Sequence, residues 1–305
     1  MIAILGPTGA GKSELAVLLA ERIGGEIVNY DSVQIYRGFD LGTAKPSVEL
    51  RARAPHHLLD IVEPDEEFHA AEFAARAMEV CAQIRQQGAV PILAGGTGFY
   101  LRALLTGLPE MPPRNELLRA RLQAVAAKRG GLDRLYRWLR RIDPEAAERI
   151  APGDRHRIER ALEVWIQTGR PISSWPSPAA TASERLPSIK IGLRVPRELL
   201  VQRLEGRTEE IYRRGLVEET RALLARYPES ARPFSSIGYR EAVLHLRGEL
   251  TLDQAIAETS RRTRAYARRQ MTWLRRELNV HWVDAADPAS GALDAMLRIV
   301  AHETG

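Results

Sequence analysis

The sequence predicts an α/β fold, in which a parallel sheet carries helices on both faces and a helical segment is inserted into the chain. Two observations support this prediction. Through roughly the first hundred residues, short apolar runs alternate with stretches of helical spacing, as they do where crossover helices join parallel strands. From about Met111 the alternation stops, and no convincing strand follows until a new apolar run at 189–195.

The individual elements follow from these two periodicities in chain order. Strands are expected at 2–5, 26–29 and 90–94, and helices at 12–22, 70–87 and 98–105. Helices are expected through 114–168, then a Ser-, Pro- and Ala-rich loop at 173–187, strands at 189–195 and 281–283, and mostly helices over 196–277. The chain is therefore predicted to divide into an α/β core, 1–110 with 189–305, and a helical insertion, 111–188.

The composition is that of an ordinary globular protein, with 45% hydrophobic and 27% charged residues. No run of about 18 or more apolar residues occurs, and the chain starts directly in a strand-like run without a charged leader. The single cysteine, Cys81, excludes a disulfide framework and a cysteine-based zinc site within one chain. We therefore expect a cytoplasmic protein with no membrane partner.

The net charge of +5 fits a polyanionic partner, and it fits equally well a basic surface with no role in nucleic-acid binding. Its distribution is more informative, because seven arginines crowd one segment together with Tyr266 and Trp273: Arg261, Arg262, Arg264, Arg268, Arg269, Arg275 and Arg276. This pattern favours contact with a phosphate backbone. The alternative is a solvated helix face.

A phosphate-binding loop follows the first predicted strand. The residues that match G-x-x-x-x-G-K-[ST] are Gly6, Pro7, Thr8, Gly9, Ala10, Gly11, Lys12 and Ser13. In such a loop, backbone N–H groups and the helix N-terminus face a polyphosphate, the lysine adds a full charge, and the serine hydroxyl can bind Mg²⁺. The motif predicts a P-loop NTPase-like sheet and a diphosphate or triphosphate ligand.

A carboxylate near this loop points away from a standard ATPase. The strand at 90–94 ends in Gly95-Gly96-Thr97-Gly98, without the acid that usually helps to hold Mg²⁺. Asp31 instead follows the strand at 26–29, at the sheet edge where ligands bind. It could take a proton from an acceptor group, with Ser32 and Gln34 beside it to form hydrogen bonds. A turn role for Asp31 and an N-cap role for Thr97 are the alternatives.

Adjacent histidines, His56 and His57, could suggest a metal site. On a strand, however, adjacent side chains point to opposite faces, and no further ligand is suitably spaced nearby. We therefore expect no zinc site here.

Taken together, the motifs resemble those of the tRNA dimethylallyltransferase family over almost the whole chain, in its bacterial form because no C-terminal zinc finger is seen. A single match would be weak, whereas this many in order is specific. Besides the P-loop they are Asp31-Ser32-x-Gln34-x-Tyr36, Asp40-Leu41-Gly42-Thr43-Ala44-Lys45-Pro46, His56-His57-Leu58-Leu59-Asp60, Gly95-Gly96-Thr97-Gly98-Phe99-Tyr100, Arg160-Ala161-Leu162-Glu163-Val164, Thr168-Gly169-x-Pro171, Gly215-Leu216-Val217-Glu218-Glu219, Ile237-Gly238-Tyr239-Arg240-Glu241 and Arg268-Arg269-Gln270-Met271-Thr272-Trp273.

The resemblance implies a role for particular residues. It implies Asp31, Thr97 and Arg207 as catalytic residues, with Asp31 as the base. It implies that residues 6–13, with Thr97 and Arg207, hold a diphosphate, and that Ser13 binds Mg²⁺. The tRNA-binding residues that it implies are Asp31, Ser32, Val33, Gln34, Thr97, Arg119, His156, Arg157, Arg160, Ser235, Ile237, Gly238, Tyr239 and Arg240.

The implied reaction moves a dimethylallyl group from dimethylallyl diphosphate to the N6 amine of the adenosine 3′ of the anticodon, and releases diphosphate. The implied partner is the tRNA anticodon stem-loop, contacted in part by the helical insertion, and we expect a monomer. Gly9-Ala10 stands where the family commonly has Ala-Ser, which leaves the chemistry intact. Prenylation of free adenine nucleotides, a P-loop small-molecule kinase and a non-catalytic RNA-binding module remain alternatives.

Overall fold

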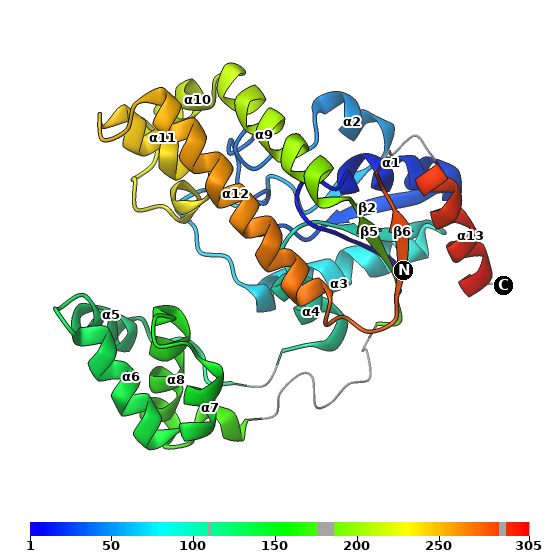
Figure 1. Ribbon diagram of the computed structural model, residues 1–305. Helices are drawn as coiled ribbons and strands as arrows, with labels where there is room; N and C mark the ends of the chain where they lie inside the picture. Colours follow the sequence, from blue (N-terminus) through cyan, green and yellow to red (C-terminus); the bar gives the residue numbers. More distant parts are fainter. Residues whose placement is uncertain (109–110, 176–185, 287–290, 305) are drawn as a thin grey trace. The chain divides into compact units, whose positions relative to one another are not determined.

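The computed structural model describes residues 1–108, 111–175, 186–286 and 291–304 (Figure 1). It divides into two compact units, which we call the core unit, 1–105 with 184–305, and the insertion unit, 106–183. Most of the loop predicted at 173–187 lies outside the described residues, and its described start belongs to a short 3-10 turn, Ile172–Ser174. Within the described ranges, no helix is both long and apolar enough to cross a membrane.

The core unit is built on a six-stranded sheet in which every neighbouring pair is parallel. In spatial order the strands are β3 (His56–His57), β2 (Gly25–Asn29), β4 (Val90–Ala94), β1 (Ile2–Leu5), β5 (Ile189–Arg194) and β6 (Val280–Asp284). The predicted α/β class with a parallel sheet is thus confirmed. Asn29 pairs with Ala94, so β2 and β4 end level and their following loops meet at one edge.

Helices cover both faces of this sheet (Figure 1). They are α1 (Lys12–Ile23), α2 (Val48–Arg53), α3 (Ala70–Gln86), α4 (Gly98–Thr106) and α13 (Leu293–Thr304). Because strand side chains alternate, Ile2 and Ile4 of β1 join one apolar cluster with α1 and α13. The helix α3 packs on β2 and β4 and contributes buried residues that are not part of that cluster. The sheet is therefore a rigid base for the loops at its carboxyl edge.

A helical subdomain completes the core unit. Its helices are α9 (Arg197–Arg213), α10 (Leu216–Leu224), α11 (Tyr239–Leu246) and α12 (Leu252–Leu274). The long helix α12 starts with a capping box, in which Thr251 Oγ1 accepts from the Gln254 N–H and Gln254 Oε1 accepts from the Thr251 N–H. It packs along α9 and α11, which brings its C-terminal half to the phosphate loop.

The insertion unit has a hydrophobic core of its own. It contains α5 (Glu116–Ala126), α6 (Gly131–Ile142), α7 (Pro144–Arg149) and α8 (Arg155–Thr168), whose buried residues form a separate apolar cluster. Two buried carboxylates tie this unit together. Glu159 accepts from Arg155 at 2.6 Å, and Glu163 accepts from Arg160 at 2.8 Å and from the Asn115 N–H at 2.6 Å. The buried charges of this unit are thus paired with groups of the same unit.

Candidate active site

The phosphate loop holds a half-buried lysine. Lys12 lies at the start of α1, and its ammonium donates to the carbonyl oxygens of Gly6 at 3.0 Å and Pro7 at 2.9 Å. Burial lowers the pKa of Lys12 to about 8, while Asp31 raises it and Arg207 lowers it. The negative groups of the protein thus do not fully balance the charge of the Lys12 ammonium. An anion in the loop would supply what is missing.

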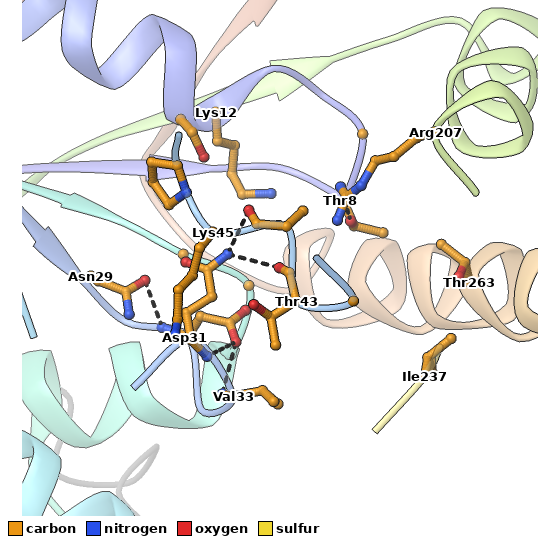
Figure 2. Close-up of a pocket in the computed structure, with 18 of the residues that line it drawn as sticks. Thr8, Lys12, Asn29, Asp31, Val33, Thr43, Lys45, Arg207, Ile237 and Thr263 are labelled. Carbon is orange, nitrogen blue, oxygen red and sulfur yellow. Dashed lines mark hydrogen bonds between the residues drawn. The ribbon is translucent and has the colours of Figure 1, made fainter. Parts of the chain in front are cut away.

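A second cation reaches the loop from α9. The Arg207 guanidinium donates to Thr8 Oγ1 at 3.3 Å (Figure 2). Burial lowers the pKa of Arg207, and Asp31 opposes this effect. Arg207 and Lys12, far apart in the sequence, therefore lie at the same loop. Both could neutralise a diphosphate.

The carboxylate of Asp31 is oriented by its own loop. Its Oδ1 accepts from the N–H groups of Val33 at 2.9 Å and Gln34 at 3.3 Å (Figure 2). Its Oδ2 faces Gly96, where an added Cβ would lie only 2.8 Å from this oxygen. The turn role and a role as base are therefore compatible, because one oxygen fixes the turn and the other remains at the cavity. A side chain at position 96 would crowd the Asp31 carboxylate, which explains the glycine there.

Neighbouring polar side chains bond mainly to the protein. Thr97 Oγ1 accepts from the Ser32 N–H at 2.9 Å and donates to Ser32 Oγ at 3.1 Å. Gln34 Nε2 donates to the carbonyl oxygens of Thr43 at 3.0 Å and Ala44 at 3.1 Å. Thr97 thus fixes the Asp31 loop against the loop that follows β4. Its implied catalytic and phosphate-holding roles stay predictions, as do the implied tRNA contacts of Ser32, Val33 and Gln34.

Two residues of α12 connect these loops, and the sequence analysis assigned neither a role in the site. Gln270 is 2% exposed, its Oε1 accepts from the Thr8 N–H at 2.8 Å, and its Nε2 donates to the Gly96 carbonyl at 2.9 Å. Tyr266 donates to the same carbonyl at 3.1 Å. A buried amide with both ends bonded fixes the phosphate loop relative to the Asp31 site. The available signal was an uncharged polar residue within an arginine-rich segment.

Lys45 is the other site residue that was overlooked. Its side chain is 1% exposed and donates to the Tyr36 carbonyl at 2.6 Å, Asp40 at 2.7 Å and Asp60 at 2.5 Å. It holds the segment that forms one wall of the cavity. In the sequence, the only indication was the position of Lys45 five residues after Asp40, within one of the motifs shared with the family. His56 also lines the cavity, whereas His57 bonds Glu26 at 2.6 Å.

These groups surround a cavity of about 710 Å³ within the core unit (Figure 2). Its polar part includes Lys12, Ser13, Asp31 and Arg207. A further part is formed by α9, α12 and the segment before α11, with these lining residues: Leu204, Thr208, Ile211, Ile237, Thr259 and Thr263. The cavity can therefore accept a ligand that has an anionic end and an apolar end, with a carboxylate nearby.

The arginine-rich segment is more neutral than its sequence suggests. Arg261 pairs with Glu258 at 2.6 Å, Arg264 pairs with Glu205 at 2.5 Å, and Arg262 pairs with the buried Glu241. A further arginine, Arg269, lies 5.7 Å from the centre of the Tyr266 ring. Much of the positive charge of α12 is thus engaged within the core unit. Contact with a phosphate backbone by this segment stays a prediction.

The implied tRNA contacts before and at the start of α11 divide into inward and outward residues. Ser235 and Ile237 line the cavity, and Arg240 is exposed. Tyr239 is 0% exposed, donates to Glu219 and accepts from the Gly42 N–H at 3.2 Å. The Gly238 N–H donates to Glu241 at 2.8 Å. Tyr239 and Gly238 therefore stabilise this wall of the site, and their tRNA contacts stay predictions.

The implied tRNA contacts of the insertion unit divide in the same way. Arg160 donates to Glu163 and, at 2.7 Å, to the Pro112 carbonyl, and Arg119 lies 3.1 Å from Glu116. His156 and Arg157 are exposed. Arg157 also lies 3.4 Å from Asp154, and contacts of all four residues with tRNA stay predictions.

Comparison with known proteins places this geometry in a family. The family model described as IPP transferase matches residues 34–277. The chain is 49% identical over 285 residues to tRNA dimethylallyltransferase 2 of Geotalea uraniireducens, covering 93% of this chain and 92% of that protein. It is 48% identical over 301 residues to the tRNA dimethylallyltransferase of Geobacter metallireducens, covering 98% and 96%.

Solved structures agree with these relatives. The full-length tRNA isopentenylpyrophosphate transferase of Bacillus halodurans has a TM-score of 0.73 and 35% identity, covering 99% of this chain and 95% of that chain. A eukaryotic dimethylallyltransferase acting on tRNA has a TM-score of 0.76 and 28% identity, covering 99% and 77%. The resemblance found in the sequence is confirmed: the chain belongs to the tRNA dimethylallyltransferase, or IPP transferase, family.

Proposed function

We propose that this protein is a tRNA dimethylallyltransferase that moves the dimethylallyl group of dimethylallyl diphosphate to the N6 amine of the adenosine 3′ of the anticodon. The observation that carries this proposal is one cavity that joins a P-loop, a second cation and an oriented carboxylate. A kinase would also need the loop. The match to tRNA-modifying relatives over nearly the whole chain favours the transferase.

On the donor side, the diphosphate lies in the P-loop. Lys12 and Arg207 converge there, and both have pKa values lowered by burial, so an anion relieves an unfavourable arrangement. The dimethylallyl group is apolar and extends into the part of the cavity that contains Leu204 and Ile211. Gln270 keeps the loop in place while the ligand binds.

In the chemical step, the N6 nitrogen attacks the first carbon of the dimethylallyl group. A carbon–nitrogen bond forms, the carbon–oxygen bond to the diphosphate breaks, and the diphosphate leaves with that electron pair. The negative charge that develops on it is stabilised by Lys12, Arg207 and the N–H groups of the loop. The amine gives its proton to Asp31 Oδ2, the oxygen that faces Gly96.

Mg²⁺ fits this site as a partner of the diphosphate. Ser13 lines the cavity on the first turn of α1, and the part of the chain that the structure describes holds no cluster of three or more His, Cys, Asp or Glu side chains for a metal. Mg²⁺ is often held by few protein ligands together with substrate phosphates and water. Bound in this way through Ser13, it would supply further charge neutralisation at the leaving group.

On the acceptor side, the adenosine must leave its stack in the anticodon loop, which costs a few kcal/mol. Contacts with the rest of the RNA must offset this cost. Ser32, Gln34, Ser235 and Ile237 lie at the cavity and are suited to the nucleotide itself. The insertion unit, with its excess of positive charge, is suited to the surrounding RNA.

The test is transfer of label from radiolabelled dimethylallyl diphosphate, with Mg²⁺, to unmodified tRNA and in parallel to AMP. Label on tRNA alone is the expected result. Label on AMP but not on tRNA would assign the protein to enzymes that prenylate free nucleotides. No label on either acceptor, with ATP consumed in the presence of a small hydroxylated acceptor, would overturn the transferase assignment in favour of a kinase.

A further inference from the structure

The net charge of the chain is concentrated in one unit. The insertion unit, 106–183, contains 14 Lys and Arg residues against 9 Asp and Glu residues, a difference of +5. The whole chain contains 44 against 39, which is also +5, so the core unit is neutral. A local excess of this kind points to a partner for the insertion unit that is itself negatively charged.

Four of the exposed arginines of this unit lie on one helix. On α6, Leu135 and Leu139 are buried, and the opposite face presents four exposed arginines: Arg134, Arg137, Arg140 and Arg141. Their spacings of three and four residues place them on one side of the helix, over a length of roughly 10 Å. We call them the α6 arginine face. Like charges at these spacings repel each other, so the helix would be more stable without them.

These arginines differ from several other exposed arginines of the protein. Some helical arginines pair with a carboxylate one turn away, as Arg76 pairs with Glu72 at 2.7 Å and Arg149 pairs with Glu145 at 2.8 Å. None of the four arginines of the α6 arginine face makes an ion pair with a described residue. Their donors therefore remain available.

We propose that the α6 arginine face binds the phosphate backbone of the tRNA, outside the nucleotide that reacts. This inference rests on the proposed function, because it takes tRNA as the substrate. A row of guanidinium groups suits successive phosphates, since each can bind a phosphate through two parallel hydrogen bonds. The row is independent of base identity, so it contributes affinity and leaves the choice of nucleotide to the cavity. The sequence analysis did not select any of these residues.

The test uses the full-length enzyme with R134Q, R137Q, R140Q and R141Q combined. The matched control combines R22Q, R85Q, R197Q and R298Q, which removes the same charge from exposed arginines on α1, α3, α9 and α13 of the core unit that likewise make no ion pair with a described residue. Binding of unmodified tRNA is measured over a range of salt concentrations. For the α6 variant, the slope of log K against log salt is expected to fall by about 3 to 4, because each lost phosphate contact removes about 1.

In steady-state assays, the KM for tRNA should rise in the α6 variant while kcat and the KM for dimethylallyl diphosphate stay at wild-type values. Replacing the four arginines with lysines should retain most of the salt slope, which separates loss of charge from loss of folding. Equal slopes in the α6 variant and the wild type, or an equal fall in the control, would overturn the inference. Failure of the proposed function would appear differently, as a wild-type enzyme that transfers no label to tRNA.

Discussion

The two units of this protein use positive charge in opposite ways. In the core unit, Lys12 and Arg207 are half-buried beside a phosphate loop, and their pKa values are lowered because their charge is costly there. In the insertion unit, the α6 arginine face is exposed to water and repels itself only weakly. The first arrangement is suited to a small anion that binds in a site partly shielded from water. The second is suited to a long polyanion that is recognised over a surface.

The negative charges follow the same division. Glu241 is buried in the core unit against Arg262, and Glu163 is buried in the insertion unit against Arg160, so both units use paired charges to hold their helices. Asp31 is different, because only one of its oxygens is engaged by the loop that carries it. A carboxylate with one available oxygen beside two half-buried cations is the feature that separates the reactive site from structural ion pairs.

The largest effect is expected from Asp31→Asn. Asparagine keeps an oxygen for the Val33 and Gln34 N–H groups, so the turn should persist while the base is lost. We expect kcat to fall by about 10²- to 10⁴-fold, with tRNA binding unchanged. Single-turnover transfer with saturating tRNA and donor measures this fall. A variant that transfers at the wild-type rate would remove Asp31 from the chemistry and with it the contrast between reactive and structural carboxylates.

A second prediction concerns the independence of the insertion unit. Leu139→Ala opens a cavity among its buried residues, which should lower the stability of this unit by about 2–5 kcal/mol. Hydrogen exchange followed by mass spectrometry should show faster exchange in α5 to α8 and unchanged protection in the sheet. The KM for tRNA should rise, and donor binding should not change.

The matched control for that prediction is Leu19→Ala, an equally buried leucine on α1 of the core unit. It should have the reverse pattern, with faster exchange around the sheet and weaker donor binding. If either substitution accelerates exchange in both units alike, the two units unfold together, and the comparison between them holds for charge alone and not for stability.

Much of the fold could be predicted from the sequence because its signals are local. The strand at 90–94 and the start of α1 behind the glycine loop depend on short apolar runs and on one loop motif. The pair His56–His57 was harder, since a two-residue edge strand has no periodicity to detect and forms only because β2 lies beside it.

The site was less accessible to such reasoning, because its supporting residues are defined by contacts over long sequence distances. Gln270 bonds Thr8, which lies 262 residues earlier in the sequence. Nothing near Gln270 in the sequence distinguishes it from a helix residue that faces RNA. The arginines of α12 were also misleading as a group, since their partners Glu205 and Glu241 come from other helices. Asp31 was predictable because its position after a strand fixes its place at the sheet edge.

A third prediction concerns the bridge between the phosphate loop and the Asp31 site. Gln270→Ala leaves the Thr8 N–H and the Gly96 carbonyl without their partner, which should destabilise the arrangement by about 1–3 kcal/mol. We expect kcat/KM for the donor to fall by roughly tenfold, since 1.4 kcal/mol corresponds to that factor. The control is Gln254→Ala at the start of the same helix, which removes a capping contact away from the cavity. An equal loss in the control would trace the effect to the stability of α12 and not to the bridge.

The smallest effect is expected from pH, and it follows from the burial of Lys12. The pKa of this residue in the donor-free enzyme is about 8, below the ordinary value of 10.5, and the diphosphate binds the protonated form. As pH rises above about 8, kcat/KM for the donor should therefore fall, by at most tenfold per unit. The same shift lowers the stability of the donor-free enzyme at neutral pH, and this stability should rise as pH increases from about 8 to about 10.5, because over that range the unfolded chain still holds a proton that the folded chain has released.

Bound donor should reverse the shift of Lys12, because the diphosphate favours the charged ammonium. With saturating donor, kcat should therefore stay level through the pH range in which kcat/KM for the donor declines. The α6 arginine face offers the internal comparison, since guanidinium groups keep their charge throughout this range and the salt dependence of tRNA binding should not change between pH 7 and 9. If tRNA affinity declined with pH in parallel with donor affinity, the two anions would not be bound independently, the donor by the core unit and the tRNA backbone by the insertion unit.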